Sequence, residues 1–429
     1  MHATKLPPMN PRRRRYSSTF LLLCAGLAVV AGNYCGSGEW GNCIPAGLGF
    51  VLAAIVLSMI AIARSGQEQS AGEASTDAPD QADGIQSGPR RRWLIFGAAI
   101  LIHGAVALYL CKAVPAITMD CFTFQRDAAN KLVHGIDPYG TTQVNVYSPV
   151  DAKRFYGPGM VANGRVLVGL QYPPLTLLWI LPGYLLGDVR YSYVLAIMIA
   201  AWLSFAMVPN KRSQWLTVFL LLNPLTFYVE NRCFTEPLVL MMLCATVYAA
   251  VKKRWWLPLA LGLLLAAKQY NFLVLPLAGY LVQPFQWRRY LKLAGTSLVV
   301  AAATVLPFAC WNLRGLWHDL VLFHLAQPFR ADAMSFAVAF PLLLKIGPLL
   351  LLAFLVWSLR VSARSAAMFA AAYGVSVLLF FSTSKQAFCN YYFLIAQALL
   401  LAVAAWPEAK TNDGDRMGDG FPEHREEGR

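Results

Sequence analysis

The chain has 429 residues, of which 57% are hydrophobic and only 14% are charged. A soluble domain carries about 25% charged residues, so this composition excludes an ordinary soluble enzyme and is typical of a polytopic membrane protein. Much of the net charge of +14 lies in clusters beside apolar runs, such as Arg12–Arg15, Arg90–Arg92 and Lys252–Arg254, so we expect contact with membrane lipids and no nucleic-acid binding.

Residues 1–63 contain two apolar runs. The first, in "RRRRYSSTFLLLCAGLAVVAG", has the basic start and small-residue end of a cleaved signal peptide. A second run, 44–63, follows almost at once, which favours a retained N-terminal helical hairpin. Cys35 and Cys43 bracket the connection between the runs, where a disulfide and two free thiols are both compatible with the sequence.

Residues 64–92 are rich in Gly, Ser, Ala and acidic residues and show no apolar period, which predicts a disordered cytoplasmic linker. The basic clusters mark the cytoplasmic side. We therefore expect cytoplasmic N- and C-termini and a disordered cytoplasmic tail at 407–429. Residues 93–406 form the main domain, and the whole chain is expected to be an all-α polytopic membrane bundle of about eleven to thirteen apolar helices.

The run 93–113 leads into an extracytoplasmic segment that ends at residue 171. Apolar residues recur in it at helical spacing from Cys121 to Leu132, and Gly135 follows where a helix C-cap is expected. This pattern predicts an amphipathic helix in the membrane interface. The motif "IDPYG" then predicts a turn, and "YPPL" predicts the start of the next membrane segment.

The apolar runs between 172 and 251 cannot all cross the membrane, because Lys252–Arg254 would then lie outside. One run is therefore expected to be short or re-entrant, and 215–229, with its internal Asn223-Pro224, is the predicted one.

Outside the cytoplasmic clusters, polar residues gather at the predicted outer ends of the apolar runs. Ionisable groups near membrane depth are costly and mark functional sites. The candidate site residues are Asp120, Asp127, Tyr172, Glu230, Arg232, Glu236, Lys268, His324, Gln327, Arg330, Lys385, Asn390 and Tyr391.

Asp120 opens the predicted interfacial helix, so its carboxylate suits either an N-cap or a general base, and the two roles are compatible. Asp127 lies about two turns later on a similar face, as a second catalytic carboxylate or as a solvated surface residue. Two such carboxylates can share a divalent cation such as Mg²⁺ or Mn²⁺. The spacing alone predicts no metal site, and the sequence leaves open whether the protein requires a divalent cation.

Lys268 interrupts the apolar stretch 255–281 with no acidic residue beside it. Its ammonium either extends to the interface or binds a phosphate, and the second interpretation is favoured. Arg232 and Glu236 have the i,i+4 spacing of a helical ion pair, so they pair with each other or contribute to the site.

Two further outer loops carry polar candidates. His324, Gln327 and Arg330 lie on one of them, and Lys385, Asn390 and Tyr391 on the other. Solvated loop residues are the simpler interpretation of both groups, although the aromatic "FCNYYF" is typical of a membrane interface.

The ordered motifs "MDCFTFQRDAANKLVHGIDPYG", "QYPPLTLLWILP", "LLNPLTFYVENRCFTEPLVL" and "LGLLLAAKQYNFLVLPL" resemble those of the GT-C class of integral-membrane glycosyltransferases. The likeness covers 93–406 and is greatest to polyprenol-phosphate-mannose-dependent mannosyltransferases. It implies catalysis by Asp120, with Asp127 as a second candidate. Lys268 would bind the donor phosphate, and Arg232, Arg330 and Lys385 are assigned to it by location. The expected substrate contacts are Tyr172, Glu230, Glu236, His324, Gln327, Asn390 and Tyr391.

The chain departs from the family pattern at two places. Glu230-Asn231 stand where many relatives have Gly-Gln, which leaves the sugar and the acceptor open. Cys121 follows Asp120 where many relatives have a second acid, which weakens the case for a required metal.

The resemblance implies an inverting transfer of a sugar, mannose by likeness, from a polyprenyl phosphate to a lipid-linked or glycan acceptor. The reaction would occur at the extracytoplasmic face of the plasma or inner membrane. A transporter or flippase of a polyprenyl-linked or amphipathic solute is the alternative, and it is expected to show paired halves and midplane polar sites. An inactive scaffold of the same fold is a further alternative. The sequence contains no Walker A, GxSxG or HExxH motif.

Overall fold

The computed structural model describes residues 17–36, 43–72 and 88–406. The predicted tail at 407–429 and residues 73–87 of the predicted linker lie outside the described residues. Six described helices are long and apolar enough to cross a membrane, and four shorter apolar helices accompany them. The predicted class, an all-α polytopic membrane bundle, is confirmed.

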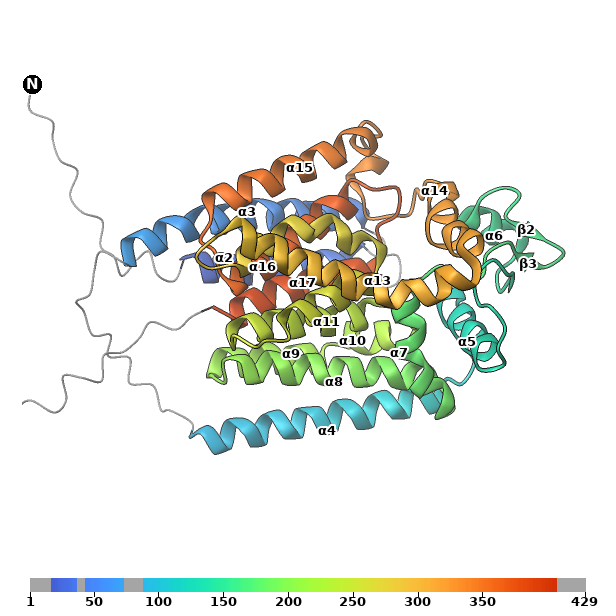
Figure 1. The fold of residues 1–429 in the computed structure, drawn as a ribbon, viewed down its shortest axis with the longest axis horizontal. Coiled ribbons are helices and arrows are strands. Elements are labelled where there is room, and N and C mark those ends of the chain that lie inside the picture. Colours follow the sequence, from blue (N-terminus) through green and yellow to red (C-terminus); the bar gives the residue numbers. More distant parts are fainter. Residues whose placement is uncertain (1–16, 37–42, 73–87, 407–429) are drawn as a thin grey trace, which may run out of the picture.

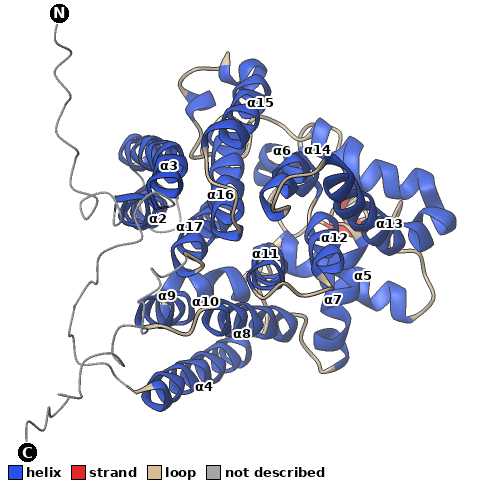
Figure 2. Cartoon of the chain, turned by 60° about the vertical axis from the view of Figure 1, so that its left-hand side comes forward, coloured by secondary structure: helices blue, strands red, loops and turns tan. Residues whose placement is uncertain are grey.

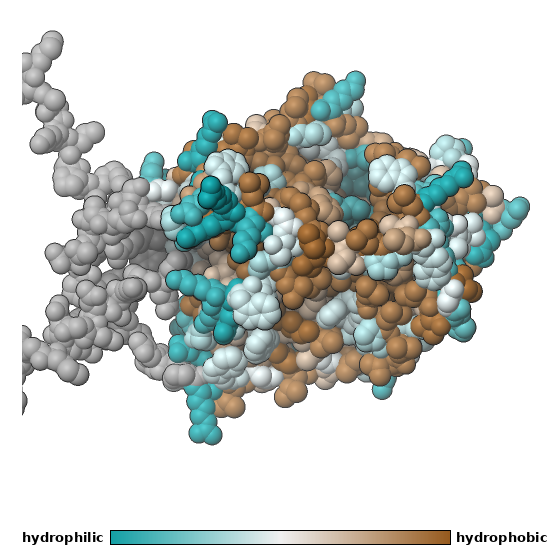
Figure 3. Space-filling model, in the orientation of Figure 1, coloured by the Kyte–Doolittle hydropathy of each residue, from teal (hydrophilic) through white to brown (hydrophobic). Residues whose placement is uncertain are grey.

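Most helices run roughly along the long axis of the molecule (Figure 1). We call the end that carries the turn after α11 (Glu236–Val251) and the first residues of α13 (Trp287–Trp317) the basic end. The opposite end, where Asp120 lies, is the Asp120 end. In Figure 3, hydrophobic side chains cover most of the middle of the visible face, and hydrophilic ones gather toward its two ends. That distribution suits a chain surrounded by lipid hydrocarbon.

Within the described residues, eleven further helices complete the bundle. In chain order they are α2 (Ser17–Gly36), α3 (Ile44–Gly72), α4 (Pro89–Ala113), α8 (Arg190–Met207), α9 (Lys211–Leu222), α10 (Pro224–Asn231), α12 (Leu257–Ala267), η1 (Gln269–Leu281), α15 (Leu343–Val361), α16 (Ala366–Ser382) and α17 (Cys389–Ala404).

The N-terminal hairpin α2–α3 packs directly on α16 and α17 (Figure 2). Asn33 Nδ2 donates to the Cys389 carbonyl over 2.9 Å, and both residues are buried. The predicted linker boundaries are wrong at both sides, because α3 continues helically over 64–72 and α4 already begins at Pro89. The hairpin is therefore part of the bundle rather than a separate appendage. The thiols of Cys35 and Cys43 are both free.

One apolar helix, α7 (Pro174–Leu185), lies across the Asp120 end instead of running along the bundle (Figure 1). Arg190, which follows it, donates to the Val114 carbonyl at the end of α4 and to Asn231 Oδ1 at the end of α10. Residues 215–229 fall in two short helices, α9 and α10, that are separated at Asn223-Pro224. α10 and α11 meet at an angle of 116°, as in a broken span or a re-entrant loop. The short or re-entrant run at 215–229 therefore stays a prediction, and α7 is a second short run in this region.

Arg190 is fully buried, and Asp188 holds its guanidinium from two residues away with contacts of 2.5–3.0 Å. Its other donors reach the Cys111 and Val114 carbonyls and Asn231 Oδ1. One side chain thus ties α4, α8 and α10 together at the Asp120 end.

The Asp120 end also carries short elements. They are α5 (Asp120–Val133), α6 (Pro149–Tyr156), η2 (His318–Leu322), α14 (Phe323–Ala326), η3 (Phe336–Val338) and the strands β1 (Gln143–Val144), β2 (Val161–Ala162) and β3 (Arg165–Val166). The strands form an antiparallel sheet in the order β1-β3-β2. The predicted amphipathic helix is confirmed as α5, with Gly135 at φ 71° beyond it, and its place in the membrane interface stays a prediction. α6 and the sheet were not predicted.

The "IDPYG" turn forms as predicted and is fixed to the end of α13 and to η2. Asp137 Oδ1 accepts from the Tyr139 N–H, and Asn312 Nδ2 donates to Asp137 Oδ2 over 2.7 Å. The buried Asp319 accepts the N–H groups of Gly140 and Gly169 at 2.9 and 3.0 Å. These contacts place the extra-bundle segment firmly over the ends of the helices.

Candidate active site

Asp120 is the first residue of α5, and Met119 is its N-cap with no side-chain cap bond. Asp120 Oδ1 accepts the N–H of Cys121 at 2.7 Å, and Oδ2 accepts the hydroxyl of Tyr156 at 3.2 Å. Its own N–H donates to the Tyr147 hydroxyl over 3.3 Å. Met119 rather than Asp120 therefore occupies the N-cap position, although the Asp120 carboxylate still accepts an N–H of the first turn. Two tyrosines of the outer segment, Tyr147 and Tyr156, hold Asp120 in place.

Burial raises the pKa of the Asp120 carboxyl, and the hydrogen bonds from Cys121 and Tyr156 oppose that shift. Burial, together with the nearby carboxylate, raises the pKa of Tyr147 and of Tyr156. Both phenols stay protonated near neutral pH. The carboxylate therefore has two neutral phenol neighbours and an increased affinity for a proton.

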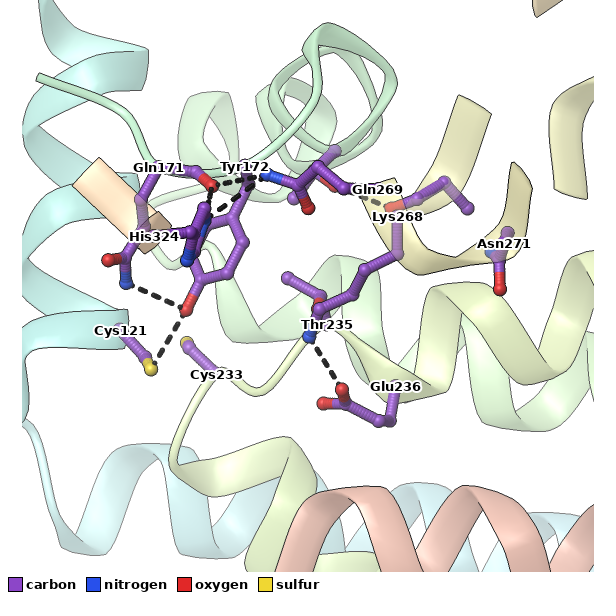
Figure 4. Close-up of polar contacts among 12 residues, drawn as sticks. Cys121, Gln171, Tyr172, Cys233, Thr235, Glu236, Lys268, Gln269, Asn271 and His324 are labelled. Carbon is purple, nitrogen blue, oxygen red and sulfur yellow. Dashed lines mark hydrogen bonds and ion pairs between the residues drawn. The ribbon is translucent and has the colours of Figure 1, made fainter. Parts of the chain in front are cut away.

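Tyr172 connects α5 to the interior of the site (Figure 4). Its hydroxyl lies 3.0 Å from Cys121 Sγ and accepts from Gln171 Nε2 at 3.2 Å, while its carbonyl accepts from Tyr139 at 2.9 Å. Burial raises the pKa of Cys121 well above its usual range, so this residue remains a thiol. Cys121 therefore contacts Tyr172 as a neutral thiol.

Lys268 lies at the break between α12 and η1, in extended backbone with φ −159°. Its Nζ is 2.6 Å from Thr235 Oγ1 and 2.6 Å from Glu236 Oε1 (Figure 4). The lysine is 6% exposed and the glutamate is fully buried. Lys268, which has no acidic neighbour in the sequence, thus finds one 32 positions away in Glu236.

The alternative of an Arg232–Glu236 pair is wrong. Arg232 is the C-cap of α10, Glu236 starts α11, and Cys233 between them has a φ of 56° that interrupts the helix. The Arg232 guanidinium instead lies 5.5 Å from the Tyr228 ring centroid. No carboxylate in the described part of the chain lies within ion-pair distance of Arg232.

Three tyrosine rings surround the Lys268 ammonium. Nζ is 5.5 Å from the ring centroid of Tyr172, 5.8 Å from that of Tyr270 and 5.2 Å from that of Tyr391. Tyr391 in turn stacks on Phe381 with a centroid separation of 3.7 Å. Aromatic faces attract an ammonium within about 6 Å, so the rings hold Nζ in place while leaving it able to donate hydrogen bonds.

His324 and Gln327 join the same site through Gln171. His324 Nε2 lies 3.0 Å from the Gln171 carbonyl, and Gln269 Nε2 donates to that carbonyl over 2.9 Å. His324 Nδ1 is 3.2 Å from Gln327 Oε1. The loop that bears α14 is thereby attached next to Tyr172.

Three buried polar atoms of the site have no hydrogen-bond partner within the described residues: Glu236 Oε2 and the Tyr270 hydroxyl, whose residues contact Lys268, and Gln171 Oε1, whose residue contacts Tyr172. Buried polar groups in native structures are nearly always paired with protein, water or ligand. This part of the site is therefore equipped to bind a ligand that carries hydroxyl groups.

Two predicted site residues are engaged elsewhere. Asp127 forms an i,i+4 pair of 2.6 Å with Lys131 on α5. Glu230 lies 3.0 Å from His103 Nε2, and both side chains are buried inside the bundle. Asn390 is buried at the start of α17, beside Tyr391.

Two predicted cations hold loops together. Arg330 binds Asp332 through two contacts of 2.7 and 2.6 Å between the rings of Phe155 and Phe388. Burial alone would raise the pKa of the Asp332 carboxyl, but the hydrogen bonds from Arg330 outweigh it and lower this pKa. Lys385 Nζ donates to the Leu325 carbonyl at 2.9 Å and to that of Gln327 at 2.5 Å, and burial lowers its pKa. Both cations thus have part of their donors engaged in holding loops.

No group of three or more His, Cys, Asp or Glu side chains suited to a metal ion occurs within 17–36, 43–72 and 88–406. Several residues of the site carried little sequence signal. Tyr147 and Tyr156 lie in an outer segment without apolar periodicity, and Gln171 and Thr235 are ordinary loop residues. His103 did have a signal, because it interrupts the apolar run 93–113.

No protein-family model matches the chain. No curated protein matches it either. Among solved structures, it is similar to the crystal structure of ArnT from Cupriavidus metallidurans bound to undecaprenyl phosphate, at 15% identity and a TM-score of 0.46. The similarity covers 71% of this chain and 59% of that one. The chain therefore spans less than two thirds of the length of the structure it matches.

Proposed function

We propose that this chain is a GT-C-type glycosyltransferase that moves a hexosyl group, mannose by motif likeness, from a polyprenyl phosphate to a lipid-linked or glycan hydroxyl. The reaction would take place at the extracytoplasmic face of the cell membrane. One observation carries the proposal: Cys121, the residue after Asp120, lies 3.0 Å from the Tyr172 hydroxyl, and the Lys268 ammonium lies 5.5 Å from the ring centroid of the same tyrosine. A carboxylate and an ammonium thus both lie near Tyr172 at one end of an apolar bundle. A donor anchored in the bilayer presents its sugar phosphate at that level.

Asp120 acts as the general base. Its carboxylate takes the proton of the acceptor hydroxyl while the hydroxyl oxygen attacks the anomeric carbon. The bond from that carbon to the phosphate oxygen breaks, the electron pair leaves with the polyprenyl phosphate, and the anomeric configuration inverts. The raised pKa of Asp120 supports this role, because a stronger carboxylate base accepts a proton more readily.

Lys268 stabilises the charge that develops on the leaving phosphate. An ammonium has three donors, and Thr235 and Glu236 occupy two of them. The third remains for a phosphate oxygen. Such a preoriented donor is worth several kcal/mol in a site that excludes water. Arg232, which lacks a carboxylate partner within the described residues, is the second cation that we assign to the donor phosphate.

The sugar lies between these groups. Glu236 Oε2 and Gln171 Oε1 are open acceptors, and the Tyr270 hydroxyl is an open donor or acceptor. These atoms suit the hydroxyl groups of a hexose. The rings of Tyr172, Tyr270 and Tyr391 offer apolar faces for its C–H groups.

The test is transfer of label from polyprenyl-phosphate [³H]mannose to a crude lipid acceptor pool in membranes that contain the wild type, Asp120→Asn or Asp120→Ala. Asn keeps an oxygen for the Cys121 N–H and cannot accept the acceptor's proton. We therefore expect both variants to lose about 10²–10⁴-fold in rate, with Asp120→Asn unfolding at the wild-type temperature.

Asp151→Asn, on α6, is the matched control and is expected to keep wild-type activity. Near wild-type transfer by Asp120→Asn would remove the general base from the proposal. Vectorial movement of the lipid without a new glycosidic bond would instead support a transporter.

A further inference from the structure

An apolar groove lies between the N-terminal hairpin and α9, separate from the residues around Asp120. Its cavity volume is about 550 Å³, within the ~300–1,000 Å³ range of small-molecule sites. Val30 and Tyr34 of α2 form one wall, and Trp215 and Phe219 of α9 form the other. Among the described residues, no Asp, Glu, Lys, Arg or His side chain lines it.

The groove opens on the lipid-facing side of the bundle. Trp215, on its wall, is 54% exposed, and α2 belongs to the helices long and apolar enough to span the membrane. Hydrocarbon is the medium around such helices. The described lining offers a charged lipid headgroup no oppositely charged side chain. Its apolar side chains suit a hydrocarbon chain instead.

One end of the groove is polar. Asn223 is 5% exposed, and its Oδ1 accepts from the Tyr34 hydroxyl at 2.7 Å and from the Leu225 N–H at 3.0 Å. Its Nδ2, by contrast, has no acceptor among the described residues. Tyr34 lies near the end of α2 that reaches the Asp120 end. We therefore expect a ligand oxygen that accepts from Asn223 Nδ2 to lie near the membrane interface, at the polar end of the groove.

We propose that this groove binds one acyl chain of a membrane glycerophospholipid, whose ester carbonyl accepts a hydrogen bond from Asn223 Nδ2. An acyl chain ends in an ester oxygen, whereas a polyprenyl chain carries no oxygen before its phosphate. Asn223 Nδ2 is a neutral donor with no charged side chain beside it in the groove, so an ester carbonyl suits it better than a phosphate does. The proposal also gives the N-terminal hairpin a role, because α2 supplies one wall of the site.

The test is photo-crosslinking of the full chain in detergent micelles with phosphatidylcholine that carries a diazirine in one acyl chain, followed by peptide mapping. We expect adducts on 215–224 that excess unlabelled phosphatidylcholine suppresses and undecaprenol does not. Suppression by undecaprenol alone would overturn the proposal in favour of a polyprenyl chain. Equal labelling of every lipid-facing helix would overturn it in favour of unspecific lipid contact.

Two variants sharpen the test. Val218→Trp fills the groove, and Asn223→Ser keeps an N-cap oxygen for α10 but removes the amide donor. Each is expected to lower the adduct yield on 215–224 about tenfold. Val56→Trp, at a lipid-facing position of α3 that is 48% exposed, is the matched control and should leave the yield unchanged. Glycosyl transfer should persist in all three, so a failure here is distinguishable from a failure of the proposed activity.

Discussion

The ammonium of Lys268 and the carboxylate of Glu236 form a buried ion pair of 2.6 Å, although 32 positions separate the two residues along the chain. A break after α12 presents the lysine, and the first residue of α11 presents the glutamate. The pair compensates the lysine charge before any donor binds and fixes the direction of the remaining N–H. It therefore serves both the stability of the bundle and the orientation of the proposed phosphate-binding group.

Removing one partner of this pair should destabilise the protein. Lys268→Met leaves a buried carboxylate without its cation, and we expect a loss of about 3–5 kcal/mol in the free energy of unfolding. The double variant Lys268→Met/Glu236→Gln should recover most of that loss but no transfer activity. Thermal unfolding in detergent and the label-transfer assay check both points. Equal stability of the wild type and the single variant would contradict the pair.

The rate should depend on pH through Asp120. Burial raises the pKa of this carboxyl above the ordinary value of about 3.9, and the base must be ionised to act. Activity should therefore fall with decreasing pH, with a midpoint above that ordinary value. Tyr156→Phe removes a hydrogen bond to the carboxylate, so it should move the midpoint of kcat/KM further upward.

Tyr109→Phe, at a 69% exposed position of α4, is the control for that shift and should leave the midpoint in place. A downward shift in Tyr156→Phe would show that the hydroxyl does not stabilise the carboxylate.

Arg232→Gln should weaken binding of the donor. The residue has no carboxylate partner in the described part of the chain, so its charge is available to a phosphate. We expect about a tenfold higher KM for the polyprenyl-phosphate sugar, equivalent to ~1.4 kcal/mol, with unfolding unchanged. Arg126→Gln, on the exposed face of α5, provides the comparison. An unaltered KM in Arg232→Gln would remove this residue from the donor site.

The buried pair of His103 and Glu230 should matter for stability rather than for substrate. His103 Nδ1 lies 2.7 Å from the Leu221 carbonyl, and Nε2 lies 3.0 Å from Glu230. His103→Phe should lower the unfolding temperature because Glu230 loses its partner. Glu230→Gln keeps a hydrogen-bonding group and should retain the KM for donor and acceptor. A KM raised tenfold in Glu230→Gln would instead support the substrate contact predicted from the sequence.

The elements that could be predicted are those whose signals are local. The spacing of Cys121, Phe124 and Leu132 predicted α5, and the Asp137–Gly140 motif predicted its turn. Lys268 stood out because a charge in an apolar stretch needs an explanation. The partner of Lys268 could not be predicted, because the i,i+4 spacing offered Arg232 as one of two alternatives for Glu236. In the structure, the break in the helix at Cys233 keeps Arg232 and Glu236 from pairing.

The topology around residues 172–251 shows the same limit. α7 and α9 are both 12 residues long, and α7 is as apolar as a crossing segment. Composition does not distinguish a helix that crosses the bilayer from one that lies across the end of a bundle. The direction of α7 follows from Tyr172 before it and Arg190 after it, and each is held by residues distant in the sequence.

The buried Arg190 has a consequence for how the protein is made. Its carboxylate partner, Asp188, emerges from the ribosome two residues earlier, so the charge is already compensated when α8 enters the membrane. The carbonyls of Cys111 and Val114 are also synthesised before it, whereas Asn231 follows later. Because chains assemble from the N-terminus during synthesis, the corner between α4 and α8 can close first and offer α10 a finished surface on which to dock.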